Sequence, residues 1–279
     1  MDASPATLAL LRHGESEWNH GNLFAGWADI DLTPRGLAQA AYAGTLLRGA
    51  EPSVVHTSLL KRSIHTAEEV LDQLDRPWVP VRRSWRLNER QYGALVGRDK
   101  ASVRAEYGHE RFTAWRRSYD GTPPPLPEGD WLALTRDPRY AELAGDVPRA
   151  ESLRDVTARL LPYWYDVLLP DLRDHGTVLV VAHSNSLRAL VKHLDGLDDE
   201  RFVGLNIPTG VPLVYRIDRT SGTPAQPGRY LDAEAAERGI AEVAAQGDAA
   251  RRDEHQAETT RRDAAAVPGT GPARIIAVH

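Results

Sequence analysis

Residues 177–186 read TVLVVAHSNS, and residues 7–14 read TLALLRHG. Each stretch is a short apolar run that ends at a histidine followed by small or polar residues, as in a buried strand that leads into a turn. In open α/β sheets, ligands bind beyond the carboxyl ends of the strands. The two stretches therefore predict that His13 and His183 lie at one functional edge of a sheet.

The rest of the chain supplies further strands and helices for such a sheet. We expect strands at residues 53–57, 78–81 and 211–217, and helices at residues 34–47, 61–74, 152–172 with a break near Pro162, and 186–194. Strands that alternate with helices are typical of a mostly parallel sheet covered on both faces. The predicted fold is an α/β three-layer sandwich. Pro212 cannot donate a ladder hydrogen bond, which predicts that residues 211–217 form an edge strand.

Two segments depart from this alternation. Residues 98–150 contain TPPPLPEGD at 122–130 and little periodicity, so we interpret them as a lid insertion with short helices inside a catalytic domain of residues 1–248. From about Asp232 the chain is rich in Ala, Glu and Arg, which predicts a helical C-terminal tail. Residues 249–279 are predicted to be a flexible extension.

Composition excludes several classes of protein. The 279 residues include 42% hydrophobic and 26% charged residues, enough for a large core, and no cysteine, which excludes disulfides, thiolate metal sites and a thiol nucleophile. The formal net charge of −5 argues against general nucleic-acid binding. No apolar run approaches the roughly 20 residues of a membrane helix, and the N-terminus lacks a signal-peptide pattern. We expect a soluble cytoplasmic protein that binds neither nucleic acid nor membrane.

The strand-end residues fit phosphoryl transfer. A neutral imidazole at His13 has a lone pair that can attack phosphorus, and Arg12 beside it offers several donors to phosphate oxygens. Arg62 follows another predicted strand, and His183 is the second strand-end histidine. Fixed cations are needed because catalysis of phosphoryl transfer is mostly positioning and charge stabilisation.

The leaving oxygen in such a reaction needs a proton. Glu89, in LNERQYG at 87–93, follows another predicted strand and is the best candidate for the proton donor. The chain has no HExxH, EF-hand or P-loop spacing, so we expect no metal and no nucleoside triphosphate.

With these residues in these positions, the sequence resembles the cofactor-dependent phosphoglycerate mutases of the histidine phosphatase superfamily. The resemblance spans residues 7–248 in family order and is carried by RHGESEWN at 12–19, AGWADIDLTPRG at 25–36, TSLLKRSIHTA at 57–67, LNERQYGAL at 87–95, ESLRDV at 151–156, AHSNSLRALVKHLDGL at 182–197 and NIPTGVPLVYRID at 206–218. It implies an α/β core, no metal, and exchange of 2- and 3-phosphoglycerate, a step of glycolysis and gluconeogenesis, primed by 2,3-bisphosphoglycerate. By analogy with the family, it also implies a homodimer or homotetramer.

The resemblance implies a role for individual residues. His13 matches the phosphorylated nucleophile, Glu89 matches the proton donor and acceptor, and Arg12, Arg62 and His183 match the phosphate pocket. The family's substrate-binding positions fall on Ser16, Asn19, Ala25, Gly26, Arg90, Tyr92, Lys100, Arg116, Arg117, Ser184 and Asn185.

Two of these positions depart from the family pattern. Ser184 stands where the family usually has glycine, and a left-handed backbone there would cost serine about 1–2 kcal/mol. Ala25 stands where the family usually has a small hydroxyl residue. These departures leave open a phosphatase or mutase paralogue that acts on another small phosphorylated acid. The lid cations Lys100, Arg116 and Arg117 favour a mutase, because a mutase must retain a doubly phosphorylated intermediate. The five catalytic side chains together argue against a catalytically silent binding protein.

Overall fold

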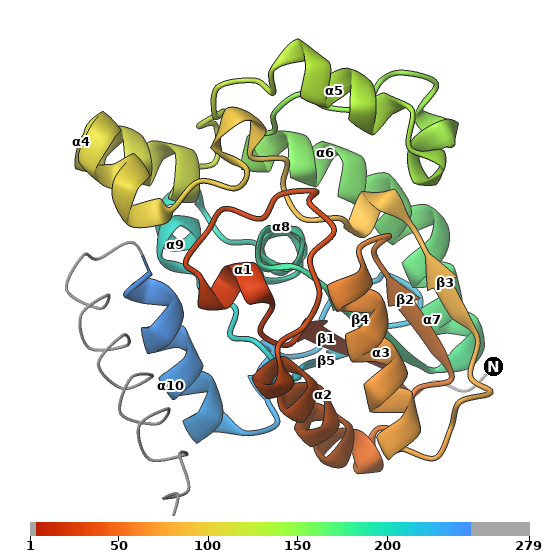
Figure 1. The fold of residues 1–279 in the computed structure, drawn as a ribbon. Helices are drawn as coiled ribbons and strands as arrows, with labels where there is room; N and C mark the ends of the chain where they lie inside the picture. Colours follow the sequence, from red (N-terminus) through yellow and green to blue (C-terminus); the bar gives the residue numbers. More distant parts are fainter. Residues whose placement is uncertain (1–3, 247–279) are drawn as a thin grey trace, which may run out of the picture. The chain divides into compact units, whose positions relative to one another are not determined.

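A computed structural model describes residues 4–246, and the predicted extension at 249–279 lies outside the described residues. A six-stranded sheet has the order β3-β2-β4-β1-β5-β6 (Figure 1). The strands are β1 (Ala6–Arg12), β2 (Val54–Thr57), β3 (Val81–Arg83), β4 (Thr177–Ala182), β5 (Leu213–Ile217) and β6 (Arg229–Tyr230). Strands β3, β2, β4 and β1 pair in parallel, whereas β5 and β6 run antiparallel to their neighbours. The sheet is therefore mixed and mostly parallel, as predicted.

Helices connect and cover the strands. They are α1 (Glu17–His20), α2 (Pro34–Leu46), α3 (Lys61–Gln73), α4 (Lys100–Arg117), α5 (Glu128–Thr135), α6 (Leu153–Tyr163), α7 (Leu169–His175), α8 (Ser184–Asp195), α9 (Asp199–Gly204) and α10 (Ala233–Ala244). Among the described residues, no helix is long and apolar enough to cross a membrane.

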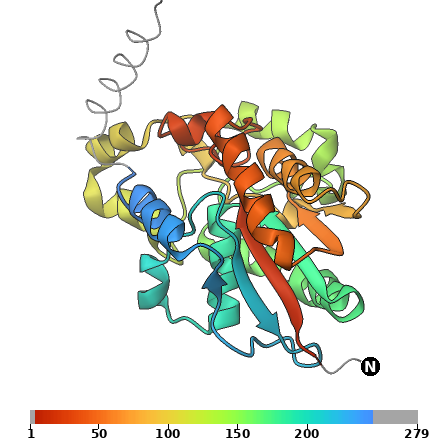
Figure 2. The ribbon, with the colours of Figure 1, turned by 90° about the horizontal axis from the view of Figure 1, so that it is seen from below.

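The core lies in two layers, one on each face of the sheet. Alternate residues of β1 and β4 point to opposite faces, so Leu10 and Val180 pack with α6, α7 and α8 while Leu11 and Val181 pack with α2 and α3. Figures 1 and 2 show the sheet between these two groups of helices. Because both faces are covered, the central strands need continuous apolar runs, which explains TLALL and TVLVVA.

Local signals set several boundaries. The hydroxyl of Thr33 accepts a hydrogen bond from the backbone N–H of Gly36 at 3.0 Å, and Pro34 occupies the first turn of α2, as predicted. The predicted break near Pro162 is a π-helical turn at Trp164–Leu168 between α6 and α7.

Two predictions about elements are wrong. The strand expected at 78–81 begins only at Val81, because residues 76–79 form a turn in which Val79 donates to the Arg76 carbonyl. Strand β5 lies inside the sheet rather than at its edge, because β6 pairs with it. Pro212 precedes β5, so its missing N–H removes no ladder hydrogen bond from that strand. Its carbonyl accepts a hydrogen bond from the backbone N–H of Leu231 at 3.0 Å. The insertion contains short helices, as predicted, because α4 consists of two helical segments that meet at the non-helical Gly108, where φ is 81°, and α5 has eight residues.

The turn after β1 packs tightly against the first turn of α2. A Cβ atom on Gly36 would lie 2.0 Å from the carbonyl oxygen of Glu15, and one on Gly14 would lie 2.1 Å from the carbonyl oxygen of Gly36. Both contacts are with backbone, which cannot move without shifting the turn. Only glycine at these two positions allows the turn that carries His13 to approach α2 so closely.

We predict that Gly36→Ala lowers the free energy of unfolding by about 1–3 kcal/mol, because the added methyl group overlaps backbone atoms. Gly49→Ala is the matched control, since nothing lies within 4 Å of the Cβ added there, and its effect should stay within about 0.5 kcal/mol. Urea titration of both variants measures the difference. Equal stability of the two variants would contradict the close approach.

Candidate active site

Two imidazoles meet at the carboxyl ends of neighbouring strands. β1 and β4 pair in parallel with Arg12 opposite Ala182, so the next residues, His13 and His183, are neighbours. Their ring centroids are 4.9 Å apart and the ring planes are inclined at 59°. Both side chains are buried, at 2% and 0% exposure. The structure thus brings together two histidines that lie 170 positions apart in the sequence.

The hydrogen bonds of His13 identify its reactive nitrogen. Nδ1 lies 2.6 Å from the carbonyl oxygen of Gly14. A carbonyl oxygen only accepts, so Nδ1 carries the proton and donates it. The lone pair of a neutral His13 is therefore on Nε2. On the second ring, Nε2 of His183 lies 2.7 Å from the hydroxyl of Ser58, while its buried Nδ1 has no partner among the described residues.

Both imidazoles are held neutral. Burial lowers the pKa of His13 well below its usual value of 6.5, and the positive charges of Arg62 and Arg12 lower it further. Burial likewise lowers the pKa of His183 well below that value, with Arg62 the largest charge contribution. Removing a charged group from water and placing it near like charges disfavours its charged form. His13 therefore keeps a free lone pair at neutral pH.

Arg12 and Arg62 are anchored by backbone carbonyls rather than by carboxylates. Arg12 donates to the carbonyl of Ile207 at 2.8 Å, and Arg62 donates to those of Gly26 at 2.9 Å and Ala28 at 2.7 Å. The Nε atoms of both are buried without a hydrogen-bond partner among the described residues. Burial lowers the pKa of Arg62 only to about 10, so it stays charged at neutral pH. These guanidinium groups retain charge and donors for an anion.

The carboxylate of Glu89 presents two different oxygens. Oε1 accepts three hydrogen bonds, from the backbone N–H of Arg90 at 2.7 Å, the backbone N–H of Asn185 at 3.2 Å and the side-chain amide of Asn185 at 2.9 Å. Oε2 has no hydrogen-bond partner among the described residues. Because Oε1 is occupied by donors, Oε2 is the oxygen able to give or take a proton.

Arg188 fixes the orientation of the Asn185 amide, and the sequence reading missed it. Arg188 donates to Oδ1 of Asn185 at 3.0 Å, and because arginine has no acceptor, the amide nitrogen must face Glu89 and the hydroxyl of Tyr92. The signal available was its place three residues after Asn185, although the predicted helix began one residue too late to contain both; α8 contains both residues and puts them on one helix face.

A small cavity of about 50 Å³ is lined by Arg12 and Glu89 from the predicted catalytic set, whereas His13, Arg62 and His183 do not line it. The predicted residues that line it are Arg12, Asn19, Ala25, Gly26, Glu89, Tyr92, Lys100, Arg116, Arg117, Ser184 and Asn185. Arg188 lines it too, so the lining includes five cationic side chains and one carboxylate. Burial and the charge of Arg116 lower the pKa of Lys100 well below its usual value. This excess of positive charge in a buried space suits a ligand with several negative charges.

The last turn of α10 contacts the cations of this cavity. Arg116 donates to the carbonyls of Val243 at 3.1 Å and Gln246 at 2.7 Å. Lys100 donates to Oε1 of Gln246 at 3.3 Å. The end of the predicted C-terminal helix thus lies beside α4 at the cavity.

Two predicted substrate-binding residues do not line the cavity. Ser16 is buried and caps α1 through hydrogen bonds with Asn19. Arg90 donates to the carbonyl of Trp115, and its guanidinium lies 4.4 Å from the centroid of the Tyr92 ring. Both therefore support residues that do line it.

The strain considered for Ser184 does not occur. Ser184 is the first residue of α8, and it is not among the described non-glycine residues with positive φ. Serine therefore fits this position without a backbone cost.

Comparisons with known proteins place the chain in a class. The profile of the histidine phosphatase superfamily (branch 1) matches residues 8–225. YhfR of Bacillus stearothermophilus has the same fold, with a TM-score of 0.62, 23% identity, and 80% of this chain and 96% of that chain covered. The chain therefore belongs to the histidine phosphatase superfamily.

Close relatives narrow this assignment. A 2,3-bisphosphoglycerate-dependent phosphoglycerate mutase of Streptomyces avermitilis is 56% identical over 251 residues, covering 88% of this chain and 99% of the relative. One of Thermobifida fusca is 56% identical over 245 residues, covering 87% and 99%. Within the superfamily, the chain belongs to the 2,3-bisphosphoglycerate-dependent phosphoglycerate mutases.

We predict that His13 and His183 remain largely neutral at pH 6.5, where a free imidazole is half protonated. Unfolding raises both pKa values to about 6.5, so below this pH the unfolded chain binds more protons than the native one. The contribution of the two neutral histidines to the free energy of unfolding is complete above pH 6.5 and falls as the pH drops below it. ¹⁵N NMR titration of the two rings checks the prediction. Half-protonation of either ring at or above pH 6.5 would contradict it.

Proposed function

We propose that this protein interconverts 2-phosphoglycerate and 3-phosphoglycerate through a phosphohistidine at His13, primed by 2,3-bisphosphoglycerate. The single observation that carries the proposal is the neutral His13 imidazole beside Arg12, Arg62 and His183, in a site that also holds a second cluster of cations. A plain phosphatase needs only the first group. The identity of 56% to phosphoglycerate mutases supports the same reaction.

Priming begins with attack on a phosphoryl group. Nε2 of His13 forms a bond to phosphorus while the bond from phosphorus to the substrate oxygen breaks. Arg12 and Arg62 stabilise the charge on the transferring oxygens, and His183 lies beside the same group. The departing oxygen takes a proton from Glu89, whose Oε2 is the available oxygen. Phosphohistidine and a monophosphoglycerate result.

The mutase cycle then runs this step in both directions. A monophosphoglycerate gives its hydroxyl proton to Glu89 and takes the phosphoryl group from His13, which forms bound 2,3-bisphosphoglycerate. The intermediate turns, and its other phosphoryl group returns to His13. The substrate carboxylate and the second phosphate are held during this turn by Lys100, Arg116 and Arg117. These cations slow dissociation of the bisphosphate intermediate. In this scheme the arginines supply the positive charge, and we assign no step to a metal.

The surroundings of the site support retention of that intermediate. The cavity is small, most of its charged lining residues are buried, and α4 and the end of α10 border it. Exclusion of water protects a phosphohistidine from hydrolysis. We place the reaction in the cytoplasm, where it serves glycolysis, and we extend the family's dimeric or tetrameric assembly to this chain by analogy.

We predict that His13→Ala abolishes mutase activity in a coupled assay with 3-phosphoglycerate and the primer, because no other group can carry the phosphoryl group. His65→Ala is the control, since His65 hydrogen-bonds Asp31 and does not line the cavity; its activity should match the parent protein. Substantial turnover by His13→Ala would refute the phosphohistidine route.

We predict that Arg117→Met weakens binding of 2,3-bisphosphoglycerate about 10- to 100-fold, as expected for one lost charged hydrogen bond of about 1.5–3 kcal/mol. Binding of inorganic phosphate at the histidine pair should change much less, since Arg117 belongs to the second cation cluster. Calorimetric titration with both ligands measures the difference. Equal losses for the two ligands would show that the cations do not divide between two subsites.

A further inference from the structure

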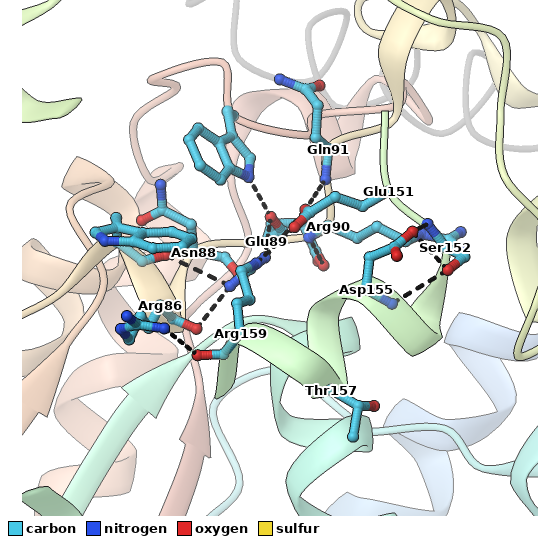
Figure 3. Close-up of polar contacts among 12 residues, drawn as sticks. Arg86, Asn88, Glu89, Arg90, Gln91, Glu151, Ser152, Asp155, Thr157 and Arg159 are labelled. Atoms are coloured by element: carbon cyan, nitrogen blue, oxygen red, sulfur yellow. Dashed lines mark hydrogen bonds and ion pairs between the residues drawn. The ribbon is translucent and has the colours of Figure 1, made fainter. Parts of the chain in front are cut away.

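We propose that Arg159 and Glu151 form a positioning pair that sets the proton-transfer geometry of Glu89. The inference rests on the proposed role of Glu89 as acid and base. Neither residue lines the cavity. Their contacts run to the backbone on both sides of Glu89 (Figure 3).

The segment that carries Glu89 forms no regular secondary structure. Residues 88–92 belong to no helix or strand, although Asn88, Glu89, Arg90 and Gln91 are all buried. Buried backbone carbonyls need hydrogen-bond donors. In a regular element the neighbouring backbone supplies them, whereas here side chains must do so.

Arg159 on α6 supplies donors on the N-terminal side. Its Nη1 donates to the carbonyl of Arg86 at 2.6 Å, and its Nη2 donates to those of Asn88 at 3.0 Å and Glu89 at 3.1 Å. One planar guanidinium therefore fixes three carbonyls, two within the segment and one just before it. The indole N–H of Trp27 also donates to the Glu89 carbonyl, at 2.6 Å.

Glu151 supplies the contacts on the C-terminal side. Its Oε2 accepts from the backbone N–H of Gln91 at 2.8 Å, and its own backbone N–H donates to the Gln91 carbonyl at 2.9 Å. The same carboxylate binds Arg159 through two hydrogen bonds, at 2.6 Å to Nε and 3.2 Å to Nη2. The pair thus holds the chain from three residues before the acid to two residues after it.

The geometry of the pair requires arginine. Arg159 and Glu151 are only 7% and 3% exposed, so each neutralises the other in a buried place. Lysine keeps the charge but has a compact ammonium, which cannot reach three carbonyls and a carboxylate from one plane. A displacement of about 1 Å in a catalytic group costs on the order of 100-fold in rate. Arg159→Lys therefore leaves the charge in place and loosens the position of Glu89.

The test uses two phosphoryl donors that differ in their need for a proton. The alkoxide leaving group of 2,3-bisphosphoglycerate must be protonated, whereas the phenolate of p-nitrophenyl phosphate leaves without a proton. We expect Arg159→Lys to slow single-turnover phosphorylation of His13 by 2,3-bisphosphoglycerate about 10- to 100-fold. We expect less than about 3-fold slowing with p-nitrophenyl phosphate, and an unchanged dissociation constant for the bisphosphate.

Two further variants make the experiment specific. Arg154→Lys on the same helix is the matched control, because Arg154 is exposed and pairs with Asp120; both donors should react as in the parent protein. Glu151→Gln keeps the size of the side chain and one acceptor oxygen, and should show the same donor selectivity as Arg159→Lys. It also serves as the test if Arg159→Lys fails to fold, as judged by circular dichroism.

The outcomes separate the two hypotheses. Equal slowing with both donors, or no slowing with either, in Arg159→Lys and Glu151→Gln would overturn the positioning role. By contrast, a parent protein that gains no phosphoryl group from 2,3-bisphosphoglycerate, or a Glu89→Gln variant slowed equally with both donors, would overturn the proposed function itself.

Discussion

The structure depends on an excess of buried positive charge around two neutral imidazoles. Five cationic side chains and one carboxylate line the cavity. The charge of Arg62 lowers the pKa of both histidines. Burying cations is costly unless they are hydrogen-bonded. Here backbone carbonyls satisfy part of that need, at Ile207 for Arg12 and at Gly26 and Ala28 for Arg62. Carbonyls carry no net charge, so the positive charge of the two guanidinium groups remains available to attract an anion.

The fold creates this arrangement because the ends of adjacent parallel strands converge. β1 and β4 deliver His13 and His183, the turn after β2 contributes Ser58, and the first turn of α3 contributes Arg62. The close approach of the turn after β1 to α2 requires Gly14 and Gly36. The second cation cluster comes from α4, outside the sheet layers. Phosphoryl chemistry thus rests on the rigid core, and substrate retention rests on the helices around it.

Sequence reasoning predicted this division well where the signal was local. Apolar runs ending at His13 and His183 predicted both strands and their shared edge, and Thr33-Pro34 predicted the start of α2. It was wrong for β5, because a two-residue strand such as β6 leaves no periodic pattern. It placed β3 too early because Trp78 and Val79 resemble strand residues but lie in a turn.

The sequence analysis overlooked Arg159 and Arg188 for the same physical reason. Arg159 and Arg188 act through hydrogen bonds to backbone carbonyls and an amide, and those partners are set only by the folded chain. In a sequence rich in arginine, neither position stands out. Ser16 and Arg90 were assigned to the substrate by resemblance; in the structure Ser16 hydrogen-bonds Asn19, Arg90 lies over the Tyr92 ring, and neither lines the cavity. A motif identifies a neighbourhood, and the contacts within it decide which side chain faces the ligand.

The most direct test of the account is the site of the covalent bond. In the protein labelled with ¹⁵N-histidine and treated with 2,3-bisphosphoglycerate, ³¹P–¹⁵N coupling identifies the nitrogen that carries phosphorus. The Nδ1–H bond to the Gly14 carbonyl leaves only one free lone pair on His13, so the account predicts coupling to Nε2 of that residue alone. Coupling to Nδ1, or to a nitrogen of His183, would contradict it.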